Sequence, residues 1–82
     1  MAEIHDILAR NLRLARQRAG VSQETLAEMA GIDRTYVSGI ERGVRNPTIS
    51  VLTQFADALG TTASALLQDD RGDADRTGSR GT

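Results

Sequence analysis

The hydrophobic residues of this chain recur with the spacing of helices. Early in the sequence, one apolar stripe follows the 3.6-residue period of a helix face through Ile4, Leu8, Leu12, Ala15 and Ala19. Gly20 directly follows the stripe, and glycine is the residue that most often ends a helix. The pattern predicts a first helix over residues 4–19, and no segment shows the alternation of a half-buried strand.

Three further stripes each begin after a residue that caps helices well. Ser22, Asp33 and Thr48 have side-chain oxygens suited to accept a hydrogen bond from the first turn. The glycines that follow these stripes are Gly31, Gly43 and Gly60. The residues expected to face the core are Leu26, Ala27, Ala30, Val37, Ile40, Ile49, Leu52, Phe55, Ala56 and Leu59. Thr62 then opens a short fifth helix through Leu67, so the predicted fold class is an all-α domain of five helices.

The connection between the second and third predicted helices is very short and contains only Gly31, Ile32 and Asp33. Two short helices joined by about three to four residues with a glycine define the helix-turn-helix, whose second helix presents its first turns to the DNA major groove. If Val37 and Ile40 of the third helix face the core, its other residues face outward. This outward group comprises Arg34, Thr35, Ser38 and Gly39.

Charge is unevenly distributed along the chain. The formal net charge of the 82 residues is −1, which by itself argues against binding to DNA phosphates. The last segment, DDRGDADRTGSRGT at residues 69–82, has no apolar side chain larger than alanine, so we expect a disordered tail after a domain at residues 1–68. All basic residues are arginines, and those of the domain cluster at residues 10–18 and 34–45. Arginine has the planar fork that binds phosphate and guanine in a bidentate manner.

The composition argues against several classes of site. With no cysteine and one histidine, the chain has no disulfide, no thiolate nucleophile and no Cys or His metal cluster, and we expect no cofactor, metal or small-molecule ligand. His5 stands beside Asp6 without a nucleophile or a glycine-rich loop, which argues against an enzyme. No apolar run approaches the roughly 20 residues of a membrane span, and the N-terminus does not resemble a signal peptide. We therefore expect a cytoplasmic protein without a membrane partner.

The side chains around the predicted turn have chemistry suited to double-stranded DNA. Arg34 can bind O6 and N7 of guanine with its fork, and Thr35 can offer a hydroxyl to a base or a methyl group to thymine. Gln23, at the start of the second helix, can reach a phosphate, as can the backbone N–H groups there. Further candidates for the DNA backbone or the groove edge are Tyr36, Arg45 and Asn46. The alternative is that these are ordinary solvated residues of a surface turn.

The segment SQETLAEMAGIDRTYVSGIERGVRNPTISVLTQFADALG resembles the helix-turn-helix of the Cro and phage-repressor class, the XRE family. The similarity covers residues 8–67 and includes the motifs SQ-x-x-LA, AG-[IV], I-E-R-G, R-N-P-[ST] and A-x-ALG at the expected distances. Within the class, DRTYVSGIERGVRNPT is most similar to the controller proteins of restriction-modification systems. The resemblance implies a lambda-repressor-like fold and a small homodimer that binds a palindromic operator to time the expression of an endonuclease and of itself.

The resemblance also implies roles for individual residues. It assigns Gln23, Ser38 and Asn46 to phosphate contact, and places Tyr36 beside the DNA backbone. It assigns Arg34, Thr35 and Arg45 to base or groove-edge readout. It implies a structural ion pair between Arg16 and Glu41. At position 39 many repressors carry a long polar side chain, whereas this chain has glycine, which implies fewer direct base contacts and a share of specificity from DNA deformability.

Self-association is expected from the size of the domain. One helix-turn-helix buries only about 600–1,000 Å² on DNA, so two copies are normally needed for specific binding. In a homodimer on a palindromic site, the two recognition helices lie about 34 Å apart. The expected interface comes from the fourth and fifth helices and comprises Val51, Phe55, Ala58, Thr62, Ala65 and Leu66. For Phe55 and Leu66, the alternative is that they only close the core of one chain.

Protein partners leave a second interpretation open. The chain can instead be an XRE-type antitoxin, or another interaction module that also binds its own operator. The spare segment for a toxin is the tail after Gln68, which lacks the apolar anchors that a partner groove requires. Activation of transcription would require a contact with RNA polymerase, for which Glu24 and Glu28 form a candidate acidic patch.

Overall fold

The computed structural model describes residues 3–69, and all regular structure in this range is helical. The five helices are α1 (Ile4–Ala19), α2 (Gln23–Ala30), α3 (Arg34–Glu41), α4 (Ile49–Leu59) and α5 (Ala63–Leu66). The prediction of an all-α, five-helix domain is thereby confirmed. The predicted disordered tail lies outside the described residues, apart from Asp69. Within residues 3–69, no helix is both long and apolar enough to cross a bilayer.

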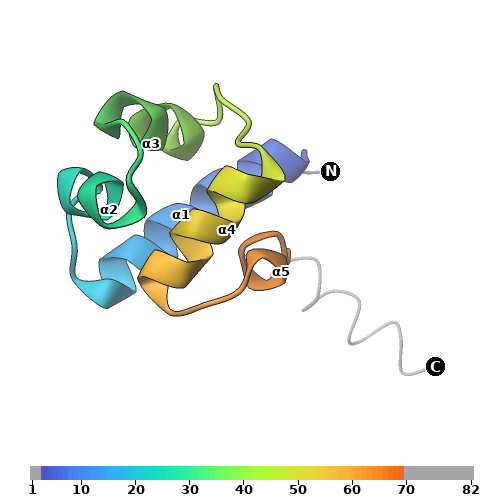
Figure 1. The fold of residues 1–82 in the computed structure, drawn as a ribbon. Helices are drawn as coiled ribbons and strands as arrows, with labels where there is room; N and C mark the ends of the chain where they lie inside the picture. Colours follow the sequence, from blue (N-terminus) through green and yellow to red (C-terminus); the bar gives the residue numbers. More distant parts are fainter. Residues whose placement is uncertain (1–2, 70–82) are drawn as a thin grey trace.

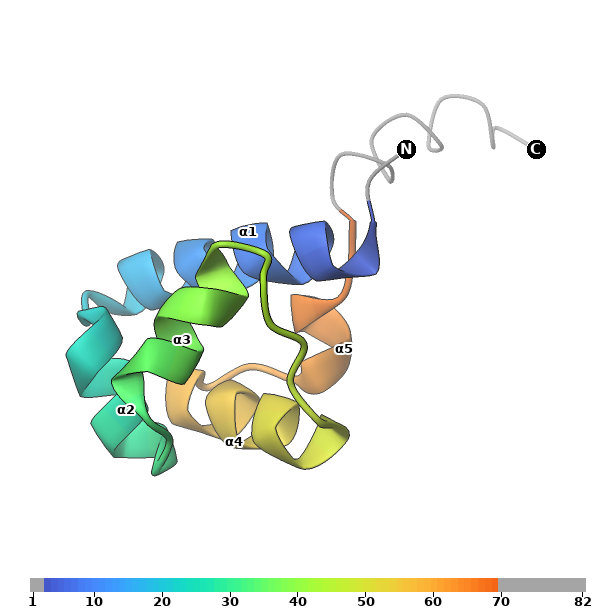
Figure 2. The same ribbon diagram turned by 90° about the horizontal axis from the view of Figure 1, so that it is seen from above.

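All five helices contribute side chains to one hydrophobic core. Figure 1 shows how the helices are arranged. Figure 2 shows α1 along one side of the domain and α4 along the other, with α2 and α3 toward one end and α5 toward the opposite end. Four of the helices contribute fully buried large side chains, which are Leu12, Leu26, Val37, Ile40 and Phe55. Two of these side chains, Val37 and Ile40, belong to α3, so their burial in the core fixes the orientation of this helix.

Local capping explains where the helices begin and end. The side chains of Ser22 and Thr48 accept hydrogen bonds from backbone N–H groups in the first turns of α2 and α4, as predicted. The glycines that end α1, α2 and α4 have left-handed φ angles of 73°, 72° and 70°. Helix α3 ends differently, since its C-cap is Arg42 in the right-handed region, and the left-handed Gly43 follows one residue later.

Ile49 was expected in the core but lies largely outside it, with 81% of its surface exposed, and Ile4 at the start of the first apolar stripe is 56% exposed. The prediction was wrong because Ile49 is the first residue of α4, at the rim of a shallow apolar depression that Ile4 and Pro47 also line. The periodicity of a helix face holds for its interior turns, whereas neighbouring helices do not cover its first residue. Leu52, one turn later, is buried as expected.

A buried amide joins α1 to the end of α5. The Asn11 side-chain nitrogen donates hydrogen bonds to the carbonyl oxygens of Leu66 at 2.9 Å and Gln68 at 2.6 Å. Carbonyl groups at a helix C-terminus have no partner within the helix, so they need donors from elsewhere. Asn11 supplies these donors across 55 and 57 residues of sequence and holds the last described turn of the chain on α1.

Candidate nucleic-acid interface

The turn between α2 and α3 is compact and internally bonded. Gly31 is left-handed, and the Ile32 N–H donates to the Ala27 carbonyl at 2.9 Å, which closes the end of α2. Asp33 then caps α3, whose Val37 and Ile40 side chains are buried. With these two residues held in the core, the opposite side of α3 is turned to solvent.

The first turn of α3 carries the exposed residues that were expected to contact bases. Arg34 and Thr35 are both exposed, and Tyr36 and Ser38 are partly exposed. The Asp33 carboxylate accepts hydrogen bonds from the Thr35 N–H at 2.7 Å and from the Thr35 hydroxyl. These two bonds lower the pKa of Asp33 because they stabilise its charged form. The Thr35 hydroxyl hydrogen is thus already used, which leaves its methyl group and oxygen lone pairs for a ligand.

The loop after α3 is bonded to the side of that helix. The backbone N–H groups of Val44 and Arg45 both donate to the Gly39 carbonyl, at 2.9 and 3.2 Å. The Tyr36 hydroxyl donates to the Asn46 carbonyl at 3.3 Å. The Arg45 guanidinium carbon lies 5.7 Å from the centre of the Tyr36 ring, in the range of a cation–π contact. The loop arginine therefore lies on the same surface as the residues of α3.

Gly39 was expected among the outward residues of α3, but it is buried. The cover comes from the loop, since the Arg45 side chain lies directly against Gly39. Sequence periodicity placed Gly39 on the correct side of the helix. It did not show that a residue six positions later folds back over that side.

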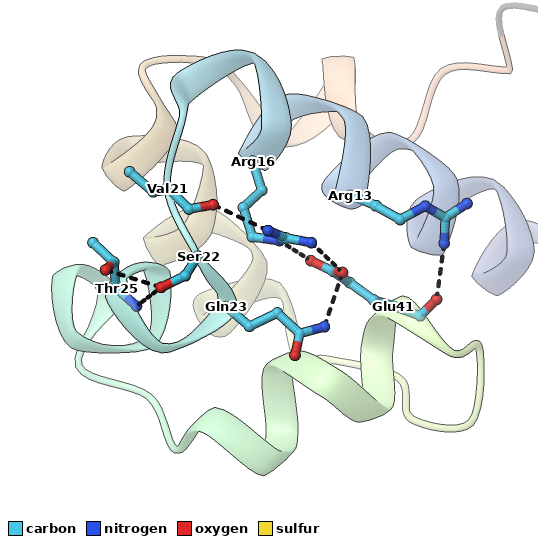
Figure 3. A network of polar contacts seen from close by, with 7 residues as sticks. All are labelled: Arg13, Arg16, Val21, Ser22, Gln23, Thr25 and Glu41. Carbon is cyan, nitrogen blue, oxygen red and sulfur yellow. Dashed lines mark hydrogen bonds and ion pairs between the residues drawn. The ribbon is translucent and has the colours of Figure 1, made fainter.

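A polar network behind this surface joins α1, α2 and α3 (Figure 3). Arg16 donates to both carboxylate oxygens of Glu41, at 2.7 and 3.1 Å, and to the Val21 carbonyl at 3.0 Å. The hydrogen bonds that Arg16 donates to Glu41 raise the pKa of Arg16, so this guanidinium stays charged. Only 4% of the Glu41 side chain and 15% of the Arg16 side chain are exposed. The ion pair that the resemblance implied is thus present as a largely buried, bidentate contact.

Gln23 also belongs to this network. Its amide nitrogen donates to Glu41 Oε1 at 3.0 Å, to the same oxygen that accepts from Arg16. The first residue of α2 is therefore fixed relative to α3. The amide nitrogen has a second hydrogen, and Gln23 is partly exposed, so one donor remains for a phosphate.

Two residues of the expected dimer interface are corrected by the structure. Phe55 is 0% exposed and Leu66 is 2% exposed, so both lie in the core of the single chain and have no side-chain surface for a partner. The other four expected residues keep exposed surface: Val51 and Ala58 partly, Thr62 and Ala65 to a larger extent. An interface through α4 and α5 is thus restricted to these smaller side chains and their neighbours.

Three contributions to this site were missed from the sequence. Arg13 donates to the Glu41 backbone carbonyl at 3.4 Å, next to the end of α3. Asp33 orients the Thr35 hydroxyl in addition to capping the helix. The contact of Arg45 with Gly39 had one detectable signal, which was a glycine in the interior of a helix, where this residue needs a packing reason.

Comparisons with known proteins agree with this geometry. The profile of the helix-turn-helix family matches residues 12–66. Control protein C.SmaI of Serratia marcescens is 46% identical over 65 residues, which are 79% of this chain and 77% of that protein. The crystal structure of the hypothetical transcription factor NHTF from Neisseria has a TM-score of 0.83 at 41% identity, over 89% of this chain and 84% of that one. The crystal structure of the restriction-modification controller protein C.AhdI from Aeromonas hydrophila has a TM-score of 0.73 at 40% identity, and the match covers 76% of this chain and 94% of that one.

The matched residues include the turn, the whole of α3 and the loop that carries Arg45. The resemblance noted from the motifs is confirmed both by sequence and by structure. The chain belongs to the helix-turn-helix family of XRE-type, DNA-binding transcription regulators, and it is similar to the controller proteins of restriction-modification systems.

Proposed function

We propose that this chain is a homodimeric regulator that binds a palindromic operator and controls a restriction-modification operon that includes its own gene. The observation that carries the proposal is the single exposed surface formed by Arg34, Thr35 and Arg45, which we call the reading surface. Two arginines and a threonine on one side of a recognition helix are the residue types that read base edges in the major groove.

Individual roles on the DNA follow from the chemistry of each side chain. Arg34 binds guanine O6 and N7 with its fork, and the Thr35 methyl group contacts thymine, because its hydroxyl hydrogen is held by Asp33. Arg45 approaches the groove edge from the loop. The phosphate and sugar contacts come from Gln23, Tyr36, Ser38 and Asn46, which surround the reading surface.

The dimer in this proposal forms through α4 and α5. Exposed surface remains on Val51 and Ala58 of α4, on Ala65 of α5 and on Thr62, the N-cap of α5. A two-fold axis at this position leaves both reading surfaces free and sets them about one DNA turn, or about 34 Å, apart. For activation, Glu24 and Glu28 on the exposed side of α2 provide an acidic surface for RNA polymerase.

The test begins with selection of duplex DNA from a randomised pool by the purified full-length protein. The shortest duplex that is retained, called the operator duplex below, is titrated in a gel shift with and without random competitor DNA. We expect a competitor-resistant complex whose sequence is palindromic. Arg34→Ala should weaken binding to the operator duplex by about 1–3 kcal/mol with little change on random DNA. Arg34→Lys should weaken binding to the operator duplex less than Arg34→Ala does, because lysine keeps the positive charge and lacks the planar fork.

The proposal is contradicted if selection yields no common sequence, or if Arg34→Ala weakens binding to operator and random DNA equally. In that case the protein would be tested by pull-down for a protein partner, as an antitoxin would require. The role in a restriction-modification operon is tested by the position of the selected sequence in the genome. It should lie upstream of this gene and of an endonuclease gene.

A further inference from the structure

Glycine is an unusual residue for the middle of a short recognition helix. Gly39 is the sixth of eight residues in α3, where glycine disfavours the helix more than any residue except proline. Its φ angle is not positive, so the backbone conformation does not require glycine. The reason for glycine at this position must therefore lie in what packs against it.

The Arg45 side chain occupies the space that a side chain at position 39 would need. A Cβ atom on Gly39 would lie 2.8 Å from both Cγ and Cδ of Arg45, and 3.2 Å from its Nε. These are the three nearest heavy atoms, and carbon atoms in contact normally stay about 3.5–4.0 Å apart. The arginine stem is thus in direct contact with the helix backbone at Gly39.

Other contacts hold Arg45 in the same path across α3. Its N–H is bonded to the Gly39 carbonyl, and its guanidinium lies over the Tyr36 ring, one helical turn nearer the start of α3. Its charge also contributes to lowering the pKa of Asp33, the N-cap of this helix. The guanidinium therefore lies toward the first turn of α3, where Arg34 and Thr35 are exposed.

We propose that Gly39 is a positioning residue for DNA recognition, because its missing side chain lets Arg45 cross the surface of α3 and serve as a reader supplied by the loop. The proposal rests on the proposed function and deepens it. In this arrangement, the side chain of Arg45 supplies the base contact that many repressors make with a polar side chain at position 39. The glycine therefore makes room for a different reader and does not reduce the number of base contacts. An arginine already held in its bound direction also loses less side-chain freedom on binding, which favours affinity.

The test is a double-mutant cycle with Gly39→Ala, Arg45→Ala and both together, measured on the operator duplex and on random DNA. Gly39→Ala should fold with an unfolding midpoint no lower than that of the wild type, because alanine favours the helix and the atoms it displaces belong to a flexible side chain. Its affinity for the operator duplex should fall about tenfold, the loss expected for one good base contact, with little change on random DNA. In the Arg45→Ala background, Gly39→Ala should cause no further loss.

A second readout follows the arginine directly in the absence of DNA. NMR of the wild type should show NOEs between the Tyr36 ring and the Arg45 side chain, and Gly39→Ala should abolish them.

The outcomes separate this inference from the proposed function. If the wild type selects an operator duplex and Gly39→Ala binds it equally well, the inference alone is overturned. It is also overturned if Gly39→Ala weakens binding by the same factor with and without Arg45, or if the variant unfolds at a lower temperature. If the wild type selects no sequence, the proposed function fails and this inference fails with it.

Discussion

Removal of the Arg16 guanidinium should destabilise the domain far more than removal of a surface charge. Arg16→Ala leaves the Glu41 carboxylate, which is 4% exposed, with Gln23 as its remaining side-chain donor. Loss of one partner of a buried pair typically costs about 3–5 kcal/mol, compared with about 0.2–1 kcal/mol for an exposed pair. Because Gln23 remains and Arg16 is itself partly accessible, we expect the lower end, about 3 kcal/mol.

That loss is large for a chain of this length. The free energy of unfolding of a domain is roughly 0.05–0.15 kcal/mol per residue, or about 4–12 kcal/mol for a chain of this size. A loss of about 3 kcal/mol should lower Tm by about 12–24 °C, since each kcal/mol shifts the Tm of such a small domain by about 4–8 °C. The variant should therefore be partly unfolded well below the transition of the wild type.

The assay is urea and thermal unfolding followed by circular dichroism, with all variants at one protein concentration because dimerisation links stability to concentration. Arg18→Ala is the matched control, since Arg18 is an exposed arginine in the last turn of the same helix. We expect the control to lose less than about 1 kcal/mol. The double variant Arg16→Met/Glu41→Leu should recover much of the loss, because no charge is then left buried. If Arg16→Ala costs no more than Arg18→Ala, the Arg16–Glu41 pair does not stabilise the fold as described.

Three further predictions concern other parts of the domain. Asn11→Ala should lower the free energy of unfolding by about 2 kcal/mol, because the buried Leu66 carbonyl loses its hydrogen-bond donor. An unchanged free energy of unfolding in urea would contradict this role of Asn11. The lowered pKa of Asp33 means that its cap stabilises α3 above the ordinary Asp pKa of about 3.9 and is lost as pH falls through the lower, folded-state value. Thermal unfolding of the wild type should therefore become more acid-sensitive than that of Asp33→Asn, and equal sensitivity would argue against this role. Ala58→Glu should shift the protein to monomer in analytical ultracentrifugation, and an unchanged sedimentation coefficient would exclude α4 from the interface.

The elements that were predictable from the sequence depend on local chemistry. A serine or threonine that caps a helix acts within three residues of itself, so Ser22 and Thr48 marked the starts of α2 and α4 correctly. The buried positions Val37 and Ile40 followed from the period of one helix. These two facts were enough to orient α3 and to indicate its exposed residues.

The features that were not predictable depend on how separate segments meet. Phe55 has the sequence character of either a core or an interface residue, and only the assembled core of the five helices shows that it is fully buried. The cover of Arg45 over Gly39 depends on the path of a loop, which periodicity does not describe. The hydrogen bond from Gln23 in α2 to Glu41 in α3 joins two residues 18 positions apart. The sequence therefore indicated Gln23 as a phosphate ligand but did not reveal its partner within the domain.

Protection of guanine N7 from dimethyl sulfate is the most direct measurement of whether the reading surface enters the major groove. On the operator duplex, the wild type should protect guanines in two clusters about 34 Å apart, and Arg34→Ala should lose protection at the equivalent guanine in both clusters. A stable complex that protects no guanine, or protection that persists unchanged in Arg34→Ala, would contradict recognition of DNA sequence by this surface.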